Sequence, residues 1–274
     1  MRLAARSCAA LALLALAACD EEGTGPMQRK PDVFVWRGTA GPGATLTVRN
    51  FAGDIEVQPS ADDSVRVNAA LEWRGSETVP TDVRFSATTG ATPGDVLICG
   101  VWGDGRCTPD DYTANVKGRR GLDAKAHFTI QVPAGMRIVA QDLSGDVTVA
   151  AAAPVRANTL TGDVRVVTAV GPVHGETLNG DVDIRMTSLG AGTDSIVGKT
   201  LNGDVFIYLR DLHDLDVDLG VMNGGVASTF PLTDAVVDKK SLKVRVGTGA
   251  RALYGYTLNG RVELRQLDSA GRAP

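Results

Sequence analysis

The stretch that decides the fold lies between residues 143 and 207, where one heptapeptide occurs four times: LSGDVTV at 143–149, LTGDVRV at 160–166, LNGDVDI at 178–184 and LNGDVFI at 201–207. Three more copies lie outside it: FAGDIEV at 51–57, MNGGVAS at 222–228 and LNGRVEL at 258–264. A short unit that recurs along a chain is the signature of a repeat architecture, so the heptapeptide predicts a fold built from stacked repeats.

Each position of the heptapeptide has a physical role. Glycine stands third in every copy, which predicts a corner with positive φ that a Cβ would penalise. The Asn, Ser or Thr before most of these glycines is typical of turns whose backbone groups bond to a short side chain. The last three residues mostly alternate apolar, variable and apolar, which predicts a strand with one buried face. The predicted corner glycines are Gly53, Gly145, Gly162, Gly180, Gly203, Gly224 and Gly260.

The spacing of the glycines selects among all-β folds. Glycines 145, 162, 180 and 203 are separated by 17, 18 and 23 residues. A hairpin meander turns about every 8–12 residues, whereas about 20 residues make one full coil of a solenoid. We therefore predict an all-β, single-stranded β-solenoid (β-helix-like). Stacked coils would place the first residue of the heptapeptide in one internal column: Leu143, Leu160, Leu178, Leu201, Met222 and Leu258.

Residues 60–141 break this period. Strand-like runs at 64–73, 82–88, 95–102 and 126–132 are separated there by turns rich in Gly, Pro and Asp. We predict longer strands that form an N-terminal β-rich cap, because a solenoid needs its ends covered. The solenoid domain would then span residues 33–267, followed by a tail at 268–274.

The repeated Ser/Thr/Asn-Gly-Asp-Val motif, with VPAG at 132–135 before its main run, resembles the bacterial putative-adhesin domains of unknown function. The resemblance covers roughly residues 44–267. It implies a secreted or lipid-anchored β-solenoid with an adhesin-like, structural or interaction role, and it carries no catalytic residue over to this chain. The copies at Gly224 and Gly260 depart from the motif, because they lack the Asp.

The first 18 residues have the layout of a lipoprotein signal peptide. Arg2 and Arg6 precede an apolar run at 11–18 that is too short to span a bilayer. The run ends in LAAC at 16–19, which resembles the bacterial lipobox, so we expect Cys19 to be acylated. An ordinary cleavage site at 15–17 is the alternative. Residues 19–32 are predicted to be a flexible tether, holding the domain to the bacterial envelope on its periplasmic or outer face.

Two cysteines, Cys99 and Cys107, remain beyond the signal and the lipid site. In an oxidising compartment such a pair is expected to form a disulfide. A hairpin over residues 95–110, turning on 103–105, would place them opposite each other. Zinc is the alternative, but two cysteines lack a third and fourth ligand nearby. Trp102, near the hairpin tip, is the best candidate for a contact residue, with packing on the solenoid as the alternative.

Charge and composition argue against nucleic acid as a partner. Without Arg2 and Arg6 the 28 basic residues fall to 26 against 32 acidic ones, a net charge of −6, and aromatic residues make up only 5%. Nucleic-acid binding would need clustered basic residues and stacking platforms.

Stacked coils would bring Asp54, Asp146, Asp163, Asp181 and Asp204 to equivalent corners. These carboxylates could bind Ca²⁺ or perform acid/base chemistry on a polysaccharide. We favour a structural role, in which each Asp accepts hydrogen bonds from turn N–H groups. Asp214, Asp216 and Asp218 are expected on the outward face of one strand, as a solvated face rather than a chelating cluster.

The three histidines, His127, His174 and His213, stand in no recognisable nucleophile or metal motif. We therefore predict a non-catalytic cell-envelope lipoprotein that needs no cofactor or metal. Its partners would be the membrane, through the lipid, and an envelope protein or polysaccharide. The alternative is a polysaccharide-processing β-helix enzyme that uses the stacked Asp residues, which would need a cleft with perturbed carboxylates.

Overall fold

The computed structural model describes residues 26–41, 43–75, 78–90, 92–115, 123–189, 194–233 and 235–268. Within these ranges the protein is all-β without an α-helix, and parallel and antiparallel strands share one 19-stranded sheet beside a separate two-stranded pair. The predicted signal peptide, Cys19, the tether up to residue 25 and the tail after residue 268 lie outside the described residues.

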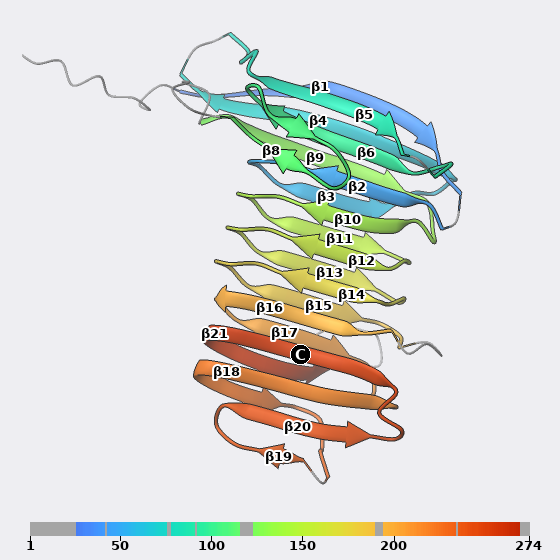
Figure 1. The fold of residues 1–274 in the computed structure, drawn as a ribbon, viewed down its shortest axis with the longest axis vertical. Helices are drawn as coiled ribbons and strands as arrows, with labels where there is room; N and C mark the ends of the chain where they lie inside the picture. The colour runs from blue at the N-terminus through green and yellow to red at the C-terminus, as the bar shows by residue number, and fades with distance from the viewer. Residues whose placement is uncertain are drawn as a thin grey trace, which may run out of the picture.

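The middle of the chain consists of short strands in regular succession, drawn from yellow-green to orange in Figure 1. Each of the first six pairs in parallel with the strand two places further along the chain. Odd- and even-numbered strands therefore form two parallel ladders, named here the odd ladder and the even ladder. The strands are β10 Arg137–Gln141, β11 Val147–Ala151, β12 Val155–Asn158, β13 Val164–Thr168, β14 Val173–Glu176, β15 Val182–Met186, β16 Ile196–Asn202 and β17 Val205–Leu209.

The core lies between the two ladders and repeats with the heptapeptide. Val147, Val164, Val182 and Val205 occupy successive register positions of the odd ladder and are fully buried. Val173 and Ile196 do the same in the even ladder. Full burial of such a side chain stabilises the fold by about 1.5–3 kcal/mol relative to an exposed position. The β-branched residues predicted to form one buried face therefore hold neighbouring repeats together.

The corner of each repeat stacks directly on the corner before it. Single β-bridges connect Ser144 to Thr161, Thr161 to Asn179, and Asn179 to Asn202. Gly180, with φ of +149°, shows why glycine is required. A Cβ at this position would lie 2.1 Å from the carbonyl oxygen of Gly162 in the neighbouring corner. Glycine thus serves both the backbone conformation and the close approach of two backbones.

The predicted internal column of large apolar residues is wrong. Leu143, Leu160, Leu178, Leu201 and Met222 are between 36% and 56% exposed. Strand residues alternate between the two faces of a sheet. At these corners it is the residue just before the leucine that points inward, and it is buried: Thr159, Thr177, Thr200 and Thr257.

The C-terminal strands depart from chain order. They are β18 Leu215–Ser228, β19 Val236–Val237, β20 Ser241–Val246 and β21 Arg251–Gln266. Strand β21 lies between β17 and β18 (Figure 1), pairing in parallel with β16 and β17 on one side and with β18 on the other. The corners therefore stack in the order Gly203, Gly260 and Gly224. Antiparallel β20 and β19 continue beyond β18.

The N-terminal strands extend both ladders and then close the end. Strands β2 and β3 pair in parallel with β10 and β11, and β6 and β9 pair in parallel with β2 and β3. Antiparallel β5 lies on β6, while β4 and then β1 follow β9. Their bounds are β1 Met27–Thr39, β2 Thr45–Arg49, β3 Ile55–Pro59, β4 Ser64–Arg74, β5 Val83–Thr89, β6 Val96–Trp102, β7 Arg106–Cys107, β8 Tyr112–Thr113 and β9 Lys125–Val132.

Two predicted boundaries need correction. Strand β1 begins at Met27, so the last part of the predicted tether, residues 27–32, is strand paired with β4. Strand β10, assigned by the sequence to the cap, pairs with β12 and belongs to the regular ladders. The four strand-like runs expected between residues 60 and 141 correspond to β4, β5, β6 and β9.

Candidate functional site

Five aspartates, one from each complete Gly-Asp copy, form a continuous column along the stacked corners, here called the Asp column. Each Oδ1 accepts a hydrogen bond from the backbone N–H of the next Asp. The distances are 3.0 Å for Asp146 to Asp54, 2.8 Å for Asp163 to Asp146, 2.8 Å for Asp181 to Asp163 and 2.7 Å for Asp204 to Asp181. The sequence placed these residues together correctly, but their hydrogen bonds run between repeats rather than within one turn.

The two ends of the Asp column carry basic side chains. At one end, Asp54 Oδ2 lies 3.1 Å from His127 Nδ1. At the other end, Arg261 takes the place of the Asp, donating from its backbone N to Asp204 Oδ1 at 2.8 Å and from its guanidinium to Asp204 Oδ2 at 2.7 Å. In the middle of the column, the Oδ2 atoms of Asp146, Asp163 and Asp181 have no hydrogen-bond partner among the described residues.

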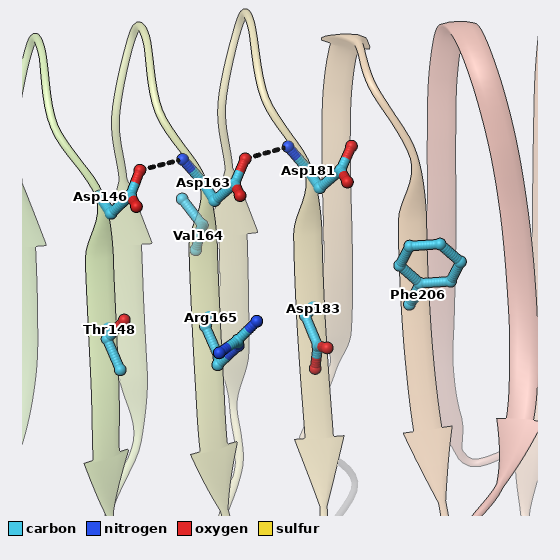
Figure 2. Close-up of a pocket in the computed structure, with 8 residues that line it drawn as sticks. All are labelled: Asp146, Thr148, Asp163, Val164, Arg165, Asp181, Asp183 and Phe206. Atoms are coloured by element: carbon cyan, nitrogen blue, oxygen red, sulfur yellow. Dashed lines mark hydrogen bonds between the residues drawn. The ribbon is translucent and has the colours of Figure 1, made fainter. Parts of the chain in front are cut away.

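A groove of about 160 Å³ runs beside the Asp column on the outer face of the odd ladder (Figure 2). Its floor is one register row, in which Thr148, Arg165, Asp183 and Phe206 follow one another across β11, β13, β15 and β17. Figure 2 shows the carboxylates of Asp146, Asp163 and Asp181 along one side, above this row. The groove therefore combines acceptor, donor and aromatic groups within four adjacent strands.

Arginines fix the aromatic end of the groove. Arg185 donates two hydrogen bonds of 2.8 Å to Asp183 and lies 5.0 Å from the ring centre of Tyr208. Arg265 lies 4.4 Å from the ring centre of Phe206 and is hydrogen-bonded to Glu263 at 2.7 Å. Cation–π contacts of this kind contribute about 0.5–1 kcal/mol each at exposed sites. Arg165 donates no hydrogen bond to Asp163 or Asp183, whose side chains are hydrogen-bonded to Asp181 and Arg185, and no described residue forms an ion pair with it.

A second column, of buried polar side chains, lies inside the same corners. The threonine hydroxyls donate to the glycine carbonyl of the preceding corner: Thr159 to Gly145 at 3.0 Å, Thr177 to Gly162 at 2.9 Å, Thr200 to Gly180 at 2.9 Å and Thr257 to Gly203 at 2.8 Å. This column was not predicted from the sequence. The signal was present, since a threonine directly precedes the leucine in each of these four copies.

Asp142 occupies the threonine position in the copy of Gly145. Its Oδ1 accepts the N–H of Leu143 at 2.8 Å, whereas its buried Oδ2 has no hydrogen-bond partner among the residues that the structure describes. Burial raises the pKa of the Asp142 carboxyl to about 7, opposed by the N–H groups of Leu143 and Ser144 and assisted by the charges of Asp54 and Asp146. In the next copy toward the N-terminus, Asn50 fills this position and donates to Ala126 O of the neighbouring strand at 3.0 Å and to Gly53 O at 3.1 Å.

Trp102, the candidate contact residue, is only 2% exposed and packs against Phe51 with ring centres 5.5 Å apart. It is therefore a core residue rather than a surface contact, because its strand β6 alternates Ile98 and Trp102 toward the core. Cys99 and Val101 point the other way, into a small apolar cluster with Cys107.

The Cys99–Cys107 disulfide is present, but the predicted hairpin is not formed as expected. Strand β7 pairs with β8 rather than with β6. The disulfide and the hydrogen bond from Tyr112 Oη to Gly100 O, 2.6 Å long, hold the β7–β8 hairpin over the outer face of β6. All seven residues of β6 are consequently buried.

The other acidic candidates form ordinary surface contacts. Asp216 and Asp218 pair with Arg245 at 2.8 Å and Lys243 at 3.0 Å across the β18–β20 pair. Asp214 does not share their strand face as expected, because it precedes β18 with φ of +51° and accepts the N–H of Thr248 at 2.9 Å. These three carboxylates are therefore not gathered into a cluster.

The remaining histidines each contact one carboxylate: His174 lies 2.9 Å from Glu176 and His213 lies 2.8 Å from Asp211. Within the described part of the chain, no group of three or more His, Cys, Asp or Glu side chains is arranged to hold a metal ion. No described helix has the length and apolar character needed to cross a membrane.

Comparison with known proteins gives only distant structural likeness. No family model and no curated protein matches the sequence. A solved structure of a putative cell adhesion protein from Clostridium sporogenes matches with a TM-score of 0.42 and 10% identity, covering 86% of this chain and 100% of its own. A putative adhesin from Bacteroides fragilis matches with a TM-score of 0.29 and 9% identity, covering 84% and 96%.

Proposed function

We propose that this protein is a non-catalytic lipoprotein of the bacterial cell envelope, in which a β-solenoid serves as an adhesin-like interaction module. Support for the solenoid comes from the two parallel ladders, in which each repeat adds one strand to each ladder. The corner bridges from Ala52 through Ser144, Thr161 and Asn179 to Asn202 follow the same succession. Such a stack presents long, flat outer faces, which suit binding by surface complementarity.

The non-catalytic proposal rests on one observation: backbone N–H groups donate hydrogen bonds to the carboxylates of the Asp column. In Asp54, Asp146, Asp163 and Asp181, Oδ1 is committed to the next Asp N–H. A glycoside hydrolase, the alternative function, needs a carboxylic acid and a carboxylate on opposite sides of the scissile bond. The carboxylates of the Asp column lie along one edge of a flat face, and Asp183 on the groove floor is held by two hydrogen bonds from Arg185, so that arrangement is not provided.

Acylation at Cys19 would hold this module to the membrane. A single acyl chain binds a membrane weakly and reversibly, whereas two or more hold it stably. The tether between Cys19 and β1 includes Asp20, Glu21 and Glu22 and has no basic cluster before Met27. Lipid rather than electrostatic attraction would therefore provide the anchor.

Two measurements test this proposal. The wild-type protein should remain in the membrane fraction at high salt, whereas Cys19→Ser should not be acylated. Beads that carry the Cys19→Ser chain should retain isolated cell envelopes, and beads blocked with an unrelated protein should not. Wild-type protein recovered wholly in the soluble fraction would contradict the anchor, and equal retention on both kinds of bead would contradict the interaction role.

The enzyme alternative has its own test. Wild-type protein incubated with isolated envelope polysaccharide should release no soluble sugar. Release that disappears in Asp163→Asn or Asp181→Asn, with the melting temperature unchanged, would replace the present proposal with the catalytic one.

A further inference from the structure

We infer that the groove beside the Asp column binds a neutral glycan chain, and this inference rests on the proposed interaction function. The groove is formed by Thr148, Arg165, Asp183 and Phe206, together with the carboxylates of Asp146, Asp163 and Asp181. Its volume of about 160 Å³ is below the roughly 300–1,000 Å³ of pockets that enclose a whole ligand, which suits one ring of a sugar chain lying along the flat face.

Hydrogen-bond chemistry points to hydroxyl groups. A sugar hydroxyl both donates and accepts, so it is best matched by a site that offers acceptors and donors side by side. The Oδ2 atoms of Asp146, Asp163 and Asp181 are acceptors without a partner among the described residues. Arg165 faces them from the middle of the row as a donor, and Thr148 adds a hydroxyl that does both.

The aromatic end of the groove is held in place before any ligand arrives. The ring centres of Phe206 and Tyr208 lie 6.4 Å apart on β17. Arg265 lies over the Phe206 ring and Arg185 over the Tyr208 ring, and both arginines are hydrogen-bonded to carboxylates. An aromatic ring offers the C–H groups of a pyranose an apolar surface. Because these side chains are already fixed, little conformational entropy is lost when a ligand binds.

Charge and polarity disfavour the other classes of ligand. An anionic polysaccharide would approach three carboxylates that have no neutralising partner in the middle of the Asp column. A stable protein interface needs a desolvated core of aromatic and aliphatic anchors, whereas the residues lining the groove are mainly charged or hydroxylic. A neutral, hydroxyl-rich chain satisfies the acceptors without adding charge.

Titration calorimetry with the full chain in a non-glycosidic detergent tests this inference. The probes are maltohexaose, cellohexaose and N-acetylchitohexaose as neutral chains, hexagalacturonate as an anionic chain, and hexalysine as a basic peptide. At least one neutral chain should bind, and Arg165→Ala and Phe206→Ala should each weaken that binding by about tenfold or more.

Matched controls come from the even ladder. Arg156 is an exposed arginine on β12, and Tyr254 is an aromatic residue on the outer face of β21. Arg156→Ala and Tyr254→Ala should leave glycan affinity unchanged. Melting curves of all four variants show whether a lost affinity is only lost folding, and Arg165, being exposed, should be replaceable without unfolding.

The inference is overturned if no neutral chain binds, if only hexagalacturonate or hexalysine binds, or if binding survives Arg165→Ala and Phe206→Ala in folded protein. It is also overturned if Tyr254→Ala abolishes binding, because the site would then lie on the other face. Retention of cell envelopes by Cys19→Ser beads in any of these cases would leave the proposed function standing without this site.

Discussion

The corners of the regular ladders and the corner at their junction with the N-terminal strands share one backbone geometry but differ in the buried side chain. In the regular corners, Thr159, Thr177 and Thr200 each donate a hydroxyl to the glycine carbonyl of the corner before. At the junction, Asp142 takes this position with a buried oxygen that has no partner. An ionised carboxylate can only accept, so it cannot replace the threonine donor.

The difference shows that the corner carbonyls receive their buried donor from different residues: threonine in the regular corners, and Asn50 for Gly53 O at the junction. Asn50, one corner further toward the N-terminus, donates its amide both to Ala126 O in the neighbouring strand β9 and to Gly53 O. Asp142 is left as a buried carboxyl, and burial raises its pKa to about 7, so that its protonation changes within the physiological range. The junction is therefore the pH-sensitive part of an otherwise uniform stack.

The largest effect is expected from a substitution that disrupts a regular corner. Gly180→Ala should destabilise the protein by on the order of 4 kcal/mol, because its Cβ would lie 2.1 Å from Gly162 O in addition to the strain of positive φ. The control is Gly43→Ala, which has positive φ but no atom within 4 Å of the new Cβ, and which should lose about 1 kcal/mol. If urea denaturation shows the same loss of unfolding free energy for Gly180→Ala and Gly43→Ala, the close stacking of corners is not the reason for the glycine.

Asp142→Asn should convert the junction into a corner like that of Asn50. A carboxyl whose pKa is raised in the folded state contributes stability that is fully present below about pH 4 and is lost as the pH rises through about 7. Between pH 4 and pH 8, the free energy of unfolding of the wild-type protein should therefore fall by on the order of 3 kcal/mol relative to that of Asp142→Asn. The control is Asp163→Asn, at an exposed corner. If the difference in free energy of unfolding between wild type and Asp142→Asn stays constant across this range, the junction is not pH-sensitive.

Loss of the disulfide should loosen the β7–β8 hairpin in the N-terminal region and leave the regular corners unchanged. The double substitution Cys99→Ala with Cys107→Ala should lower the free energy of unfolding by about 2.5 kcal/mol on the chain-entropy account. Hydrogen exchange should rise in β7 and β8, which the bond holds over β6, and remain unchanged in β13 and β15. Faster exchange throughout the odd ladder would show that the regular repeats depend on this hairpin.

The smallest expected effect lies at the opposite end of the Asp column. Arg261 is 59% exposed and pairs with Asp204, so Arg261→Ala should shift the Tm by about 2 °C or less, because solvent screens exposed ion pairs. High salt should reduce the difference further. A shift as large as that of Gly180→Ala would show that Arg261 is essential for inserting β21 between β17 and β18.

Much of the fold could be predicted from the chain because each repeat meets the same local requirements. The positive φ at the motif glycines, the alternating valines and the alignment of the Asp residues all follow from turn chemistry and strand periodicity. The error over Leu143 and its equivalents has a local cause as well. A shift of one residue exchanges the inward and outward faces of a strand. The prediction placed leucine inside because it is the more hydrophobic residue, whereas the threonine before it is the buried one.

The sequence by itself determined the all-β class, the repeat, the corners and the residues that align along them, because these depend on interactions between neighbouring residues and identical copies. Only the tertiary structure decided which repeat lies against which. Strand β21 enters between β17 and β18 through backbone pairing along both of its edges. Arg261 of β21 pairs there with Asp204, where β18 has Gly225 at the same register position. The groove, the buried Trp102 and the high pKa of Asp142 likewise arise where distant segments meet, since burial and charge depend on the whole surrounding fold.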